Sequence, residues 1–563
     1  MVVPRLPERR FVPDNALKPL LCREAVVAAL EEQKSELETD ISILAAFVCN
    51  RARKLFAMLA CNSNEAAIEY FYELGFGDEK LPIEIKITQA RDLGESDIEE
   101  ESDIIETGWS YMNLEDFAYS QWLFLSPTFF GNNFRYQFDY RTRMPFINYD
   151  SLSQREGQFS VVEQWRVHRD HLQLGRTTGI HSKSDEHPYV AIKELKTFGL
   201  HNNTFKAVAE ELATTLEKVR ELDHPHLIKA IAYYKKGDRH YVMFPWATQG
   251  NLQDFWNRGP YTLDPGFFEW VFTQLCGVAE AIERLHGSNN PKLWRHLNLK
   301  PEKILCFDND STQDGSCVFV ITFVASIRVD NRIISEMWEG HISSRTLMYD
   351  PPEAELQPHL PKSRQYDIWS IGCIYLEFII WLLYGTKELQ HFRDDLCGFR
   401  AAMRFYVVEE VQNTRTKTAQ LNSAVQKWID WIRKDPRCPE QTAIRSLIEL
   451  VVKRLLVTDV GRISSFSHTY STLREGELTA QTNSIKPSII RTSTSSGHFD
   501  LFDDASAQVR ATAKEMNHLI KQILGDATSR TSKRLEWMKW DAPTQQGPRR
   551  YGPRLNPLDA GVL

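Results

Sequence analysis

The ten residues HLNLKPEKIL, from His296 to Leu305, carry more information about the fold than any other stretch of the chain. They follow a helix-like run over Phe268–Leu285, so they are predicted to form a loop after a helix. A second informative stretch, YDIWSIGC from Tyr366 to Cys373, lies downstream. Each motif gains specificity from the other, because further short motifs stand between and around them in a defined order.

Together, the motifs span about 300 residues, which is the length of a large domain. Upstream are VAIK (190–193), LDHPHLI (222–228), YVMFPW (241–246) and GNL (250–252). Downstream are PPE (351–353) and LLVTDVGRIS (455–464).

Taken together, the motifs resemble the protein-kinase family, whose catalytic loop is usually written H-R-D-L-K-P-E-N-I-L. The resemblance covers residues 154–473 and both lobes. It implies an α+β, bilobal kinase fold with a small β-rich lobe and a large helical lobe, here after a mainly helical N-terminal domain. The general pattern also resembles fungal kinase-like proteins that carry a helical N-terminal extension.

Several positions keep the residue that the family uses. The resemblance makes Lys193 the residue that holds the nucleotide phosphates and pairs with an acidic residue of the αC helix. It makes Asp367 the residue that holds the catalytic-loop backbone, and Glu353 and Arg462 an ion pair. Lys300 matches the lysine that touches the transferred phosphate in Ser/Thr kinases.

Three other positions depart from the family where the chemistry takes place. Asn298 stands at the catalytic aspartate, and an amide cannot accept the substrate proton as a carboxylate does. Lys303 stands at a magnesium-binding asparagine, and an ammonium group has no acceptor for a cation. Phe323 stands where the second magnesium ligand is expected, although magnesium prefers oxygen ligands. The sequence therefore predicts no protein-derived metal site, and magnesium binding is doubtful.

The nucleotide-binding positions are partly kept. Gly157 is the one glycine that remains of the three in the glycine-rich loop. Ungapped counting places Thr215 at the αC acid, whereas Glu211 lies one helical turn earlier on the same face and could reach the lysine. Phe244 is predicted as the gatekeeper, and Ala247 as the hinge residue that donates an N–H. Because the hinge uses mainly backbone groups, ATP binding stays open.

Outside residues 154–473, the sequence predicts three further regions. Residues 1–150 form a helical and aromatic-rich extension, in which the aromatic run 109–140 is predicted to be packed. Residues 479–500 read as a flexible Ser/Thr-rich linker. Residues 501–563 are predicted as a C-terminal helix and a disordered tail. The apolar run 368–384 contains Glu377 and lies in the second motif, so it is predicted as a buried helix.

Composition limits the function classes. The net charge of −8 offers no basic footprint for nucleic acid, and neither a nucleic-acid nor a membrane partner is expected. Nine cysteines without metal-ligand spacing, and a start without a signal-peptide pattern, favour a reduced cytoplasmic or nuclear setting.

Two functions remain open: a pseudokinase that acts as a signalling scaffold or allosteric regulator with a protein partner, or an active kinase that transfers the ATP γ-phosphate to Ser/Thr with atypical residues. A small-molecule kinase is disfavoured because that class lacks the L-K-P-E, P-P-E and D-x-W-S-x-G motifs.

Overall fold

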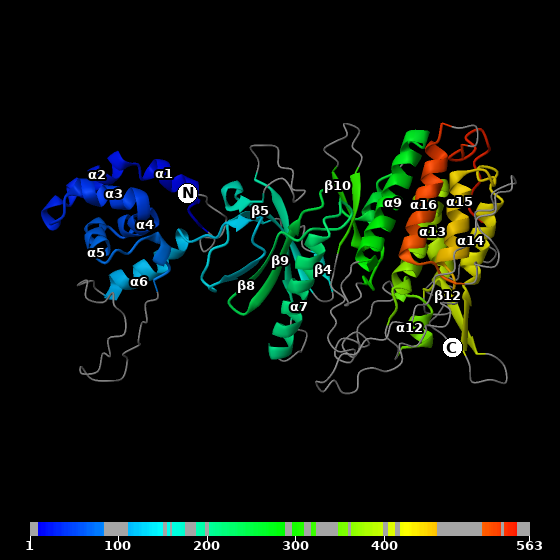
Figure 1. Cartoon of the computed structure of the whole chain (residues 1–563), viewed down its shortest axis with the longest axis horizontal. Helices are drawn as coiled ribbons and strands as arrows, with labels where there is room; N and C mark the ends of the chain where they lie inside the picture. Colours follow the sequence, from blue (N-terminus) through cyan, green and yellow to red (C-terminus); the bar gives the residue numbers. More distant parts are fainter. Residues whose placement is uncertain are drawn as a thin grey trace, which may run out of the picture. The chain divides into compact units, whose positions relative to one another are not determined.

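The computed structural model describes residues 10–83, 111–149, 155–157, 160–174, 187–196, 202–259, 261–287, 295–308, 317–322, 347–358, 362–397, 403–410, 417–458, 509–530 and 534–548. The chain divides into two compact units, each described by itself below (Figure 1). Unit 1 holds residues 1–223 and 228–246, and unit 2 holds residues 224–227 and 247–563. The chain passes from unit 1 to unit 2 between Trp246 and Ala247, in the segment predicted as the hinge.

Unit 1 begins with short α-helices that pack around one apolar core. Leu44, Val48, Leu55 and Phe71 are among its buried side chains, and they belong to the extension that the sequence predicted to be helical. The side chain of Asp40 caps one of these helices by accepting a hydrogen bond from the Ser42 amide at 2.8 Å. The helices are α1 (Asp14–Leu20), α2 (Arg23–Glu32), α3 (Ile41–Arg51), α4 (Arg53–Cys61), α5 (Ile68–Glu73) and α6 (Tyr111–Ser120).

The second part of unit 1 is a seven-stranded sheet with the strand order β2-β8-β9-β7-β5-β3, in which β4 also pairs with β5. Its strands are β2 (Arg135–Phe138), β3 (Phe146–Tyr149), β4 (Arg155–Gly157), β5 (Ser160–Val167), β7 (Tyr189–Leu195), β8 (Ala232–Lys236) and β9 (Arg239–Pro245). A two-stranded parallel pair joins β1 (Phe129–Phe130) to β6 (Leu172–Gln173). The helix α7 (Asn202–Glu221) connects β7 to β8.

Both ends of the strand order belong to residues that the sequence assigned to a separate extension. Strand β2 pairs in parallel with β8, and β3 pairs antiparallel with β5. The predicted boundary at residue 150 therefore does not separate two structural units, because these strands complete the sheet of the predicted kinase domain. Pairing also covers strand edges whose N–H and C=O groups would otherwise be open.

The aromatic run of the extension is packed only in part. Among its described side chains, those of Phe117, Trp122, Phe124, Phe129 and Phe134 are buried, whereas those of Tyr119, Phe130 and Tyr140 are exposed. The ring of Phe129 is fully buried and contacts the rings of Tyr136, Phe138 and Tyr234, with centroid distances of 5.1, 6.1 and 6.0 Å. Tyr234 belongs to β8, so these contacts join the extension to the sheet. Burial of such large rings explains why this segment is rich in aromatic residues.

Unit 2 consists mainly of helices. Its helices and strands are α8 (Leu252–Asn257), α9 (Pro265–Gly287), β10 (Ile304–Asp308), β11 (Cys317–Ile321), α12 (Glu353–Leu356), α13 (Gln365–Cys397), β12 (Tyr406–Glu410), β13 (Lys417–Leu421), α14 (Ser423–Arg433), α15 (Ala443–Leu450) and α16 (Ala513–Thr528). By length and composition α13 could cross a membrane, but 89% of its most apolar window is buried inside the fold. That burial agrees with the predicted core helix. Gly385, at a φ of 84°, kinks α13 in a conformation that favours glycine.

The C-terminal helix α16 lies beside α9 in unit 2 (Figure 1). Its side chains Met516, Ile520 and Ile523 are buried. Residues after it also pack on α9, since Trp537 lies 5.2 Å from Phe272 between ring centroids. The predicted domain end at residue 473 therefore cuts through a compact unit, and α16 is not an appendage. The predicted linker 479–500 and the tail beyond residue 548 lie outside the described residues.

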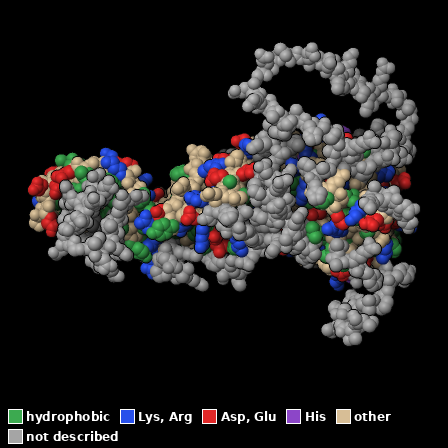
Figure 2. Space-filling model, turned by 90° about the horizontal axis from the view of Figure 1, so that it is seen from below, with side chains coloured by type: hydrophobic (Ala, Val, Ile, Leu, Met, Phe, Trp, Pro, Cys, Tyr) green, Lys and Arg blue, Asp and Glu red, His purple; other side chains and the backbone are tan. Residues whose placement is uncertain are grey.

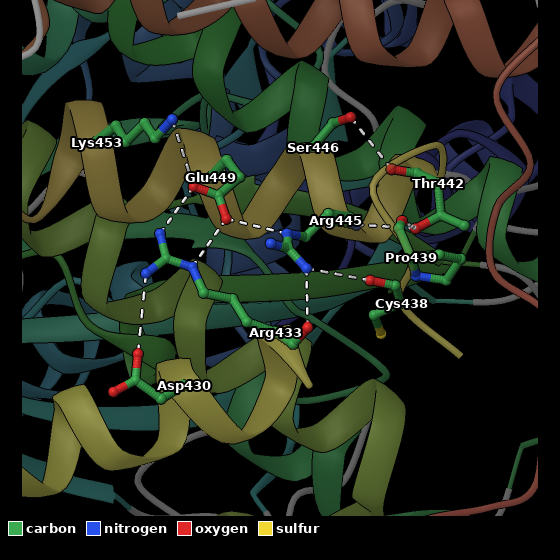
Figure 3. Close-up of polar contacts among 9 residues, drawn as sticks. All are labelled: Asp430, Arg433, Cys438, Pro439, Thr442, Arg445, Ser446, Glu449 and Lys453. Carbon is green, nitrogen blue, oxygen red and sulfur yellow. Dashed lines mark hydrogen bonds and ion pairs between the residues drawn. The ribbon is translucent and has the colours of Figure 1, made fainter. Parts of the chain in front are cut away.

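A single carboxylate joins α14 to α15 (Figure 3). Glu449 accepts hydrogen bonds from Arg433 Nε and Nη2, both at 2.8 Å, and from Arg445 Nε at 3.0 Å. The ammonium group of Lys453 lies 3.8 Å away. This half-buried cluster fixes the two helices against each other through paired charges rather than through apolar contact alone.

The described surface carries charges of both signs. On the face drawn in Figure 2, Lys and Arg side chains stand beside Asp and Glu side chains. Exposed pairs such as Arg51 with Glu79 are typical of this mixture. Pairs of this kind contribute little to stability, about 0–1 kcal/mol each.

Candidate nucleotide site

The first feature of the candidate site is the loop that begins at His296. The carboxylate of Asp367, at the start of α13, accepts the amide hydrogens of His296 at 2.8 Å and Leu297 at 2.7 Å. It also lies 2.9 Å from Nε2 of His286 in α9. Leu297 has a φ of 57°, a left-handed conformation that costs a residue with a Cβ roughly 1–3 kcal/mol. Asp367 therefore holds a strained loop, which is the part that the resemblance implied for it.

The charge of Asp367 is stabilised in place. Its side chain is fully buried, and burial by itself raises the pKa of a carboxyl group. Hydrogen bonds from His286 and from the His296 amide outweigh that effect and leave the pKa of Asp367 below its ordinary value. An ionised, fully hydrogen-bonded carboxylate is thus retained beneath a loop whose catalytic residues have changed.

The loop then presents Asn298, Lys300 and Lys303. The backbone N–H of Asn298 donates a hydrogen bond to Nδ1 of His296 at 3.3 Å, and the backbone N–H of Lys303 donates one to the Lys300 carbonyl at 2.8 Å. Burial and the neighbouring Lys300 lower the pKa of Lys303 to about 8. Near neutral pH, Lys303 therefore remains mostly protonated, and a bound anion would favour that charged form further.

The hairpin β10–β11 fixes where the chain returns to this loop. Ile304 pairs with Ile321, so β11 ends two residues before Phe323, as the alignment of the motifs required. Thr322 donates its amide to the Lys303 carbonyl at 2.8 Å, and its carbonyl lies 2.6 Å from Nε2 of His296. Phe323 itself lies outside the described residues.

In unit 1, the sheet positions the predicted nucleotide-binding residues. Lys193, at the centre of β7, pairs with Val162 of β5 and Val242 of β9. Phe244 pairs with Ala191 and is half-buried, and Gly157 ends β4 opposite Ser160. The strand-to-strand connection 157–160 is thus where the glycine-rich loop was predicted.

The αC prediction concerns helix α7. Its buried face consists of residues such as Leu212 and Leu216, and Glu211 is half-buried beside that face. Glu217 accepts a hydrogen bond from Nε of Arg135 at 3.0 Å, so its carboxylate is held by the extension strand β2. The assignment of Glu211 over Thr215 as partner of the β7 lysine stays a prediction.

The ion pair predicted for Glu353 has a different partner. Both oxygens of Glu353 bind Arg510, whose Nη1 and Nη2 lie 2.6 and 3.0 Å away. Arg510 also donates to the carbonyls of Gln365 at 3.1 Å and Val457 at 3.0 Å, and its guanidinium lies 5.0 Å from the ring centre of Trp369. Among the residues that the structure describes, Arg510 is thus the cation bound to Glu353, whereas the predicted partner Arg462 lies outside the described residues.

Arg510 was missed because some fifty residues separate it from the motif that drew attention to Arg462. A signal was present in the segment Arg510–Thr512, directly before α16. Thr512 and Glu515 form a capping box at the start of that helix, so the arginine stands at a clear helix boundary. The capping box predicts where the helix starts, but burial of the arginine cannot be read from sequence, so this signal alone does not select Arg510 over Arg462.

The sequence comparison agrees with this extended unit. Residues 175–525 match the family described as protein kinase domain, a span that ends within α16 and includes Arg510. The chain belongs to the protein kinase domain family. Its fold is accordingly the α+β kinase fold, after an N-terminal region that is mostly helical over residues 14–80.

Curated relatives are distant members of the same family. The chain is 24% identical to "Probable serine/threonine-protein kinase samkB" of Dictyostelium discoideum over 229 residues, which is 40% of this chain and 32% of the relative. It is 27% identical to "Serine/threonine-protein kinase 16" of Mus musculus over 198 residues, 31% of this chain and 61% of the relative. The chain thus matches less than two thirds of the length of these relatives.

The kinase fold implies that ATP could bind. Lys193 in unit 1 and Lys303 in unit 2 each carry an ammonium group, which has no acceptor for a metal ion, and Asn298 has one amide oxygen. Among the residues that the structure describes, no three His, Cys, Asp or Glu side chains are arranged to hold a metal ion. Asn298 could orient a hydroxyl group by a hydrogen bond but could not take its proton.

Proposed function

We propose that this kinase-family protein is a pseudokinase that binds ATP without magnesium-dependent phosphoryl transfer and acts as a signalling scaffold or allosteric regulator. The observation that carries the proposal is the contrast within one loop. Asp367 holds the loop by two amide hydrogen bonds, while the residues it presents are Asn298 and Lys303. A chain that keeps the carboxylate holding the loop, but replaces the proposed base and metal ligand on that loop, is suited to binding a nucleotide rather than to transferring its phosphate.

Lys303 is proposed to supply the positive charge that a metal ion supplies in other kinases. Its pKa of about 8 is set by burial and by Lys300, so an adjacent phosphate would gain a nearly desolvated cation. One lysine cannot bridge two phosphates and a leaving oxygen as magnesium does, which is why binding without transfer is expected.

The test is a thermal-shift titration of the full chain with ATP, once with magnesium and once with a chelator. A ligand that binds only the folded state adds about 2.7 kcal/mol at a hundredfold excess over its dissociation constant. We expect a shift in chelator that Lys303→Met abolishes. Lys514→Met, at an exposed lysine of the same unit, should keep it. No shift under either condition would refute nucleotide binding.

The second candidate is an active Ser/Thr kinase with atypical residues. It is favoured by the retention of Lys193, Lys300 and Asp367, and by relatives that are named as serine/threonine-protein kinases. Transfer of labelled γ-phosphate to the chain or to a generic Ser/Thr substrate distinguishes the two. Magnesium-dependent transfer would replace the pseudokinase proposal with this one.

The partner is proposed to be a protein, met in the cytoplasm or nucleus. The helical N-terminal region, which adds surface to the kinase fold, is the proposed contact region. Resemblance to fungal kinase-like proteins stays a prediction. Purification of the full chain with and without residues 1–80 from its native cells would test whether this region recruits the partner.

A further inference from the structure

A basic side chain from the extension donates hydrogen bonds to three side chains of helix α7 within unit 1. Arg135, the first residue of β2, donates from Nη1 to Glu210 at 2.6 Å, from Nε to Glu217 at 3.0 Å and from Nη2 to Thr214 at 2.8 Å. These three acceptors stand at positions i, i+4 and i+7 of the helix, so they form one stripe along it. One planar guanidinium therefore spans two helical turns.

Arg135 is itself held in place from the sheet. It pairs with Tyr233 in the parallel register of β2 and β8. The Tyr233 hydroxyl donates to the second oxygen of Glu210 at 3.2 Å and lies 2.6 Å from Nδ1 of His240. The helix, the extension strand and the central sheet thus share one polar network.

A second contact fixes the end of the same helix. Arg220 donates from Nη2 to the carbonyl of Gly131 at 3.0 Å, and its guanidinium lies 5.0 Å from the ring centre of Phe134. Gly131 is in turn bound through its amide to the Gln173 carbonyl at 2.9 Å. A Cβ at Gly131 would lie 2.5 Å from the carbonyl oxygen of Leu174, so this turn admits only glycine without a shift of backbone.

We propose that residues 129–138 form a clamp that sets the rotation of α7, with Arg135 as a positioning residue for the nucleotide site. In a helix of 3.6 residues per turn, Glu211 lies about 100° around the axis from Glu210. Fixing the stripe of Glu210, Thr214 and Glu217 therefore fixes the direction in which Glu211 points. The nucleotide part of this inference rests on the proposed function; the clamp itself does not.

The test measures amide hydrogen exchange of α7 in the full chain. We expect Arg135→Ala to speed exchange over residues 205–221 by about threefold to tenfold, while exchange in α3 and α4 stays unchanged. Glu210→Gln combined with Glu217→Gln should produce the same local effect from the helix side, and Arg135→Lys an intermediate one. Arg51→Ala, which removes the exposed pair with Glu79, is the matched control.

The outcomes separate the clamp from the nucleotide proposal. If α7 exchanges in Arg135→Ala as it does in Arg51→Ala, the clamp is refuted. If α7 loosens and the wild type binds ATP, we expect the dissociation constant of Arg135→Ala to rise about threefold to tenfold, and an unchanged constant would refute the positioning role. If the wild type binds no ATP, the proposed function fails, and α7 exchange alone decides on the clamp.

Discussion

Arg510 offers the sharpest test of how the large unit is held together. Its guanidinium is buried with 1% of the residue exposed, and it donates to Glu353, Gln365 and Val457. Arg510→Ala would leave the Glu353 carboxylate, whose side chain is 11% exposed, without its cation. We expect a large loss of stability from this single change.

The magnitude follows from the contacts. Removing one partner of a buried ion pair costs about 3–5 kcal/mol, because the remaining charge stays buried without compensation. Two carbonyl groups also lose a donor, at about 1 kcal/mol each or somewhat more. Since these effects share one site and are not additive, we expect roughly 4 kcal/mol in all. For a unit of this size, that corresponds to a fall in Tm of roughly 8–16 °C.

The assay is thermal and urea unfolding of the full chain, followed by tryptophan fluorescence, with hydrogen exchange to assign the loss to unit 2. Lys427→Ala, at an exposed cation of the same unit, is the control, and we expect it to change the free energy of unfolding by less than about 0.5 kcal/mol. Combining Arg510→Met with Glu353→Leu should recover much of the loss, because no charge then remains buried alone. The reasoning is refuted if Arg510→Ala destabilises unit 2 no more than Lys427→Ala does.

Two further predictions concern other buried groups. Asp367→Asn should lower the free energy of unfolding by about 2–4 kcal/mol and speed hydrogen exchange of the Leu297 amide, because the NH2 group of the new side chain cannot accept one of the two backbone N–H groups that the carboxylate accepts now. Asp430→Asn, at a half-exposed side chain, should change neither quantity. In unit 1, burial lowers the pKa of His168 to about 4, so the unfolded chain binds more protons between about pH 6.5 and 4. The contribution of His168 to the free energy of unfolding is complete above about pH 6.5 and should fall by about 2 kcal/mol at pH 5. His168→Gln should flatten the pH dependence by that amount and His391→Gln should not, while other histidines with a lowered pKa, such as His240, keep their own contributions.

Much of the kinase fold could be predicted from local sequence. Motifs of ten residues or fewer predict the loop at His296, the strand that carries Lys193 and the helix that begins near Asp367, because the geometry of each depends on neighbours in the chain. The changed chemistry at Asn298 and Lys303 is equally local, since the side chain alone decides what it can donate or accept.

Other features depend on contacts between distant segments. Glu353 and Arg510 are 157 residues apart, and nothing in either local pattern selects one arginine over another. Likewise, β2 carries Arg135 to a helix that it meets only because the strand pairs with β8. Sequence periodicity cannot report such pairings.

The sequence by itself thus determined the family, and it predicts the loss of the base and of a metal-ligand position, because these reside in short motifs and in the donors and acceptors of single side chains. The tertiary structure alone decided that the extension completes the sheet, that α16 belongs to the large unit, and that Arg510 is the partner of Glu353. Each of these features depends on a contact between segments that are distant in the chain. Such contacts form because an unpaired buried charge or an unpaired strand edge would raise the free energy of the folded state.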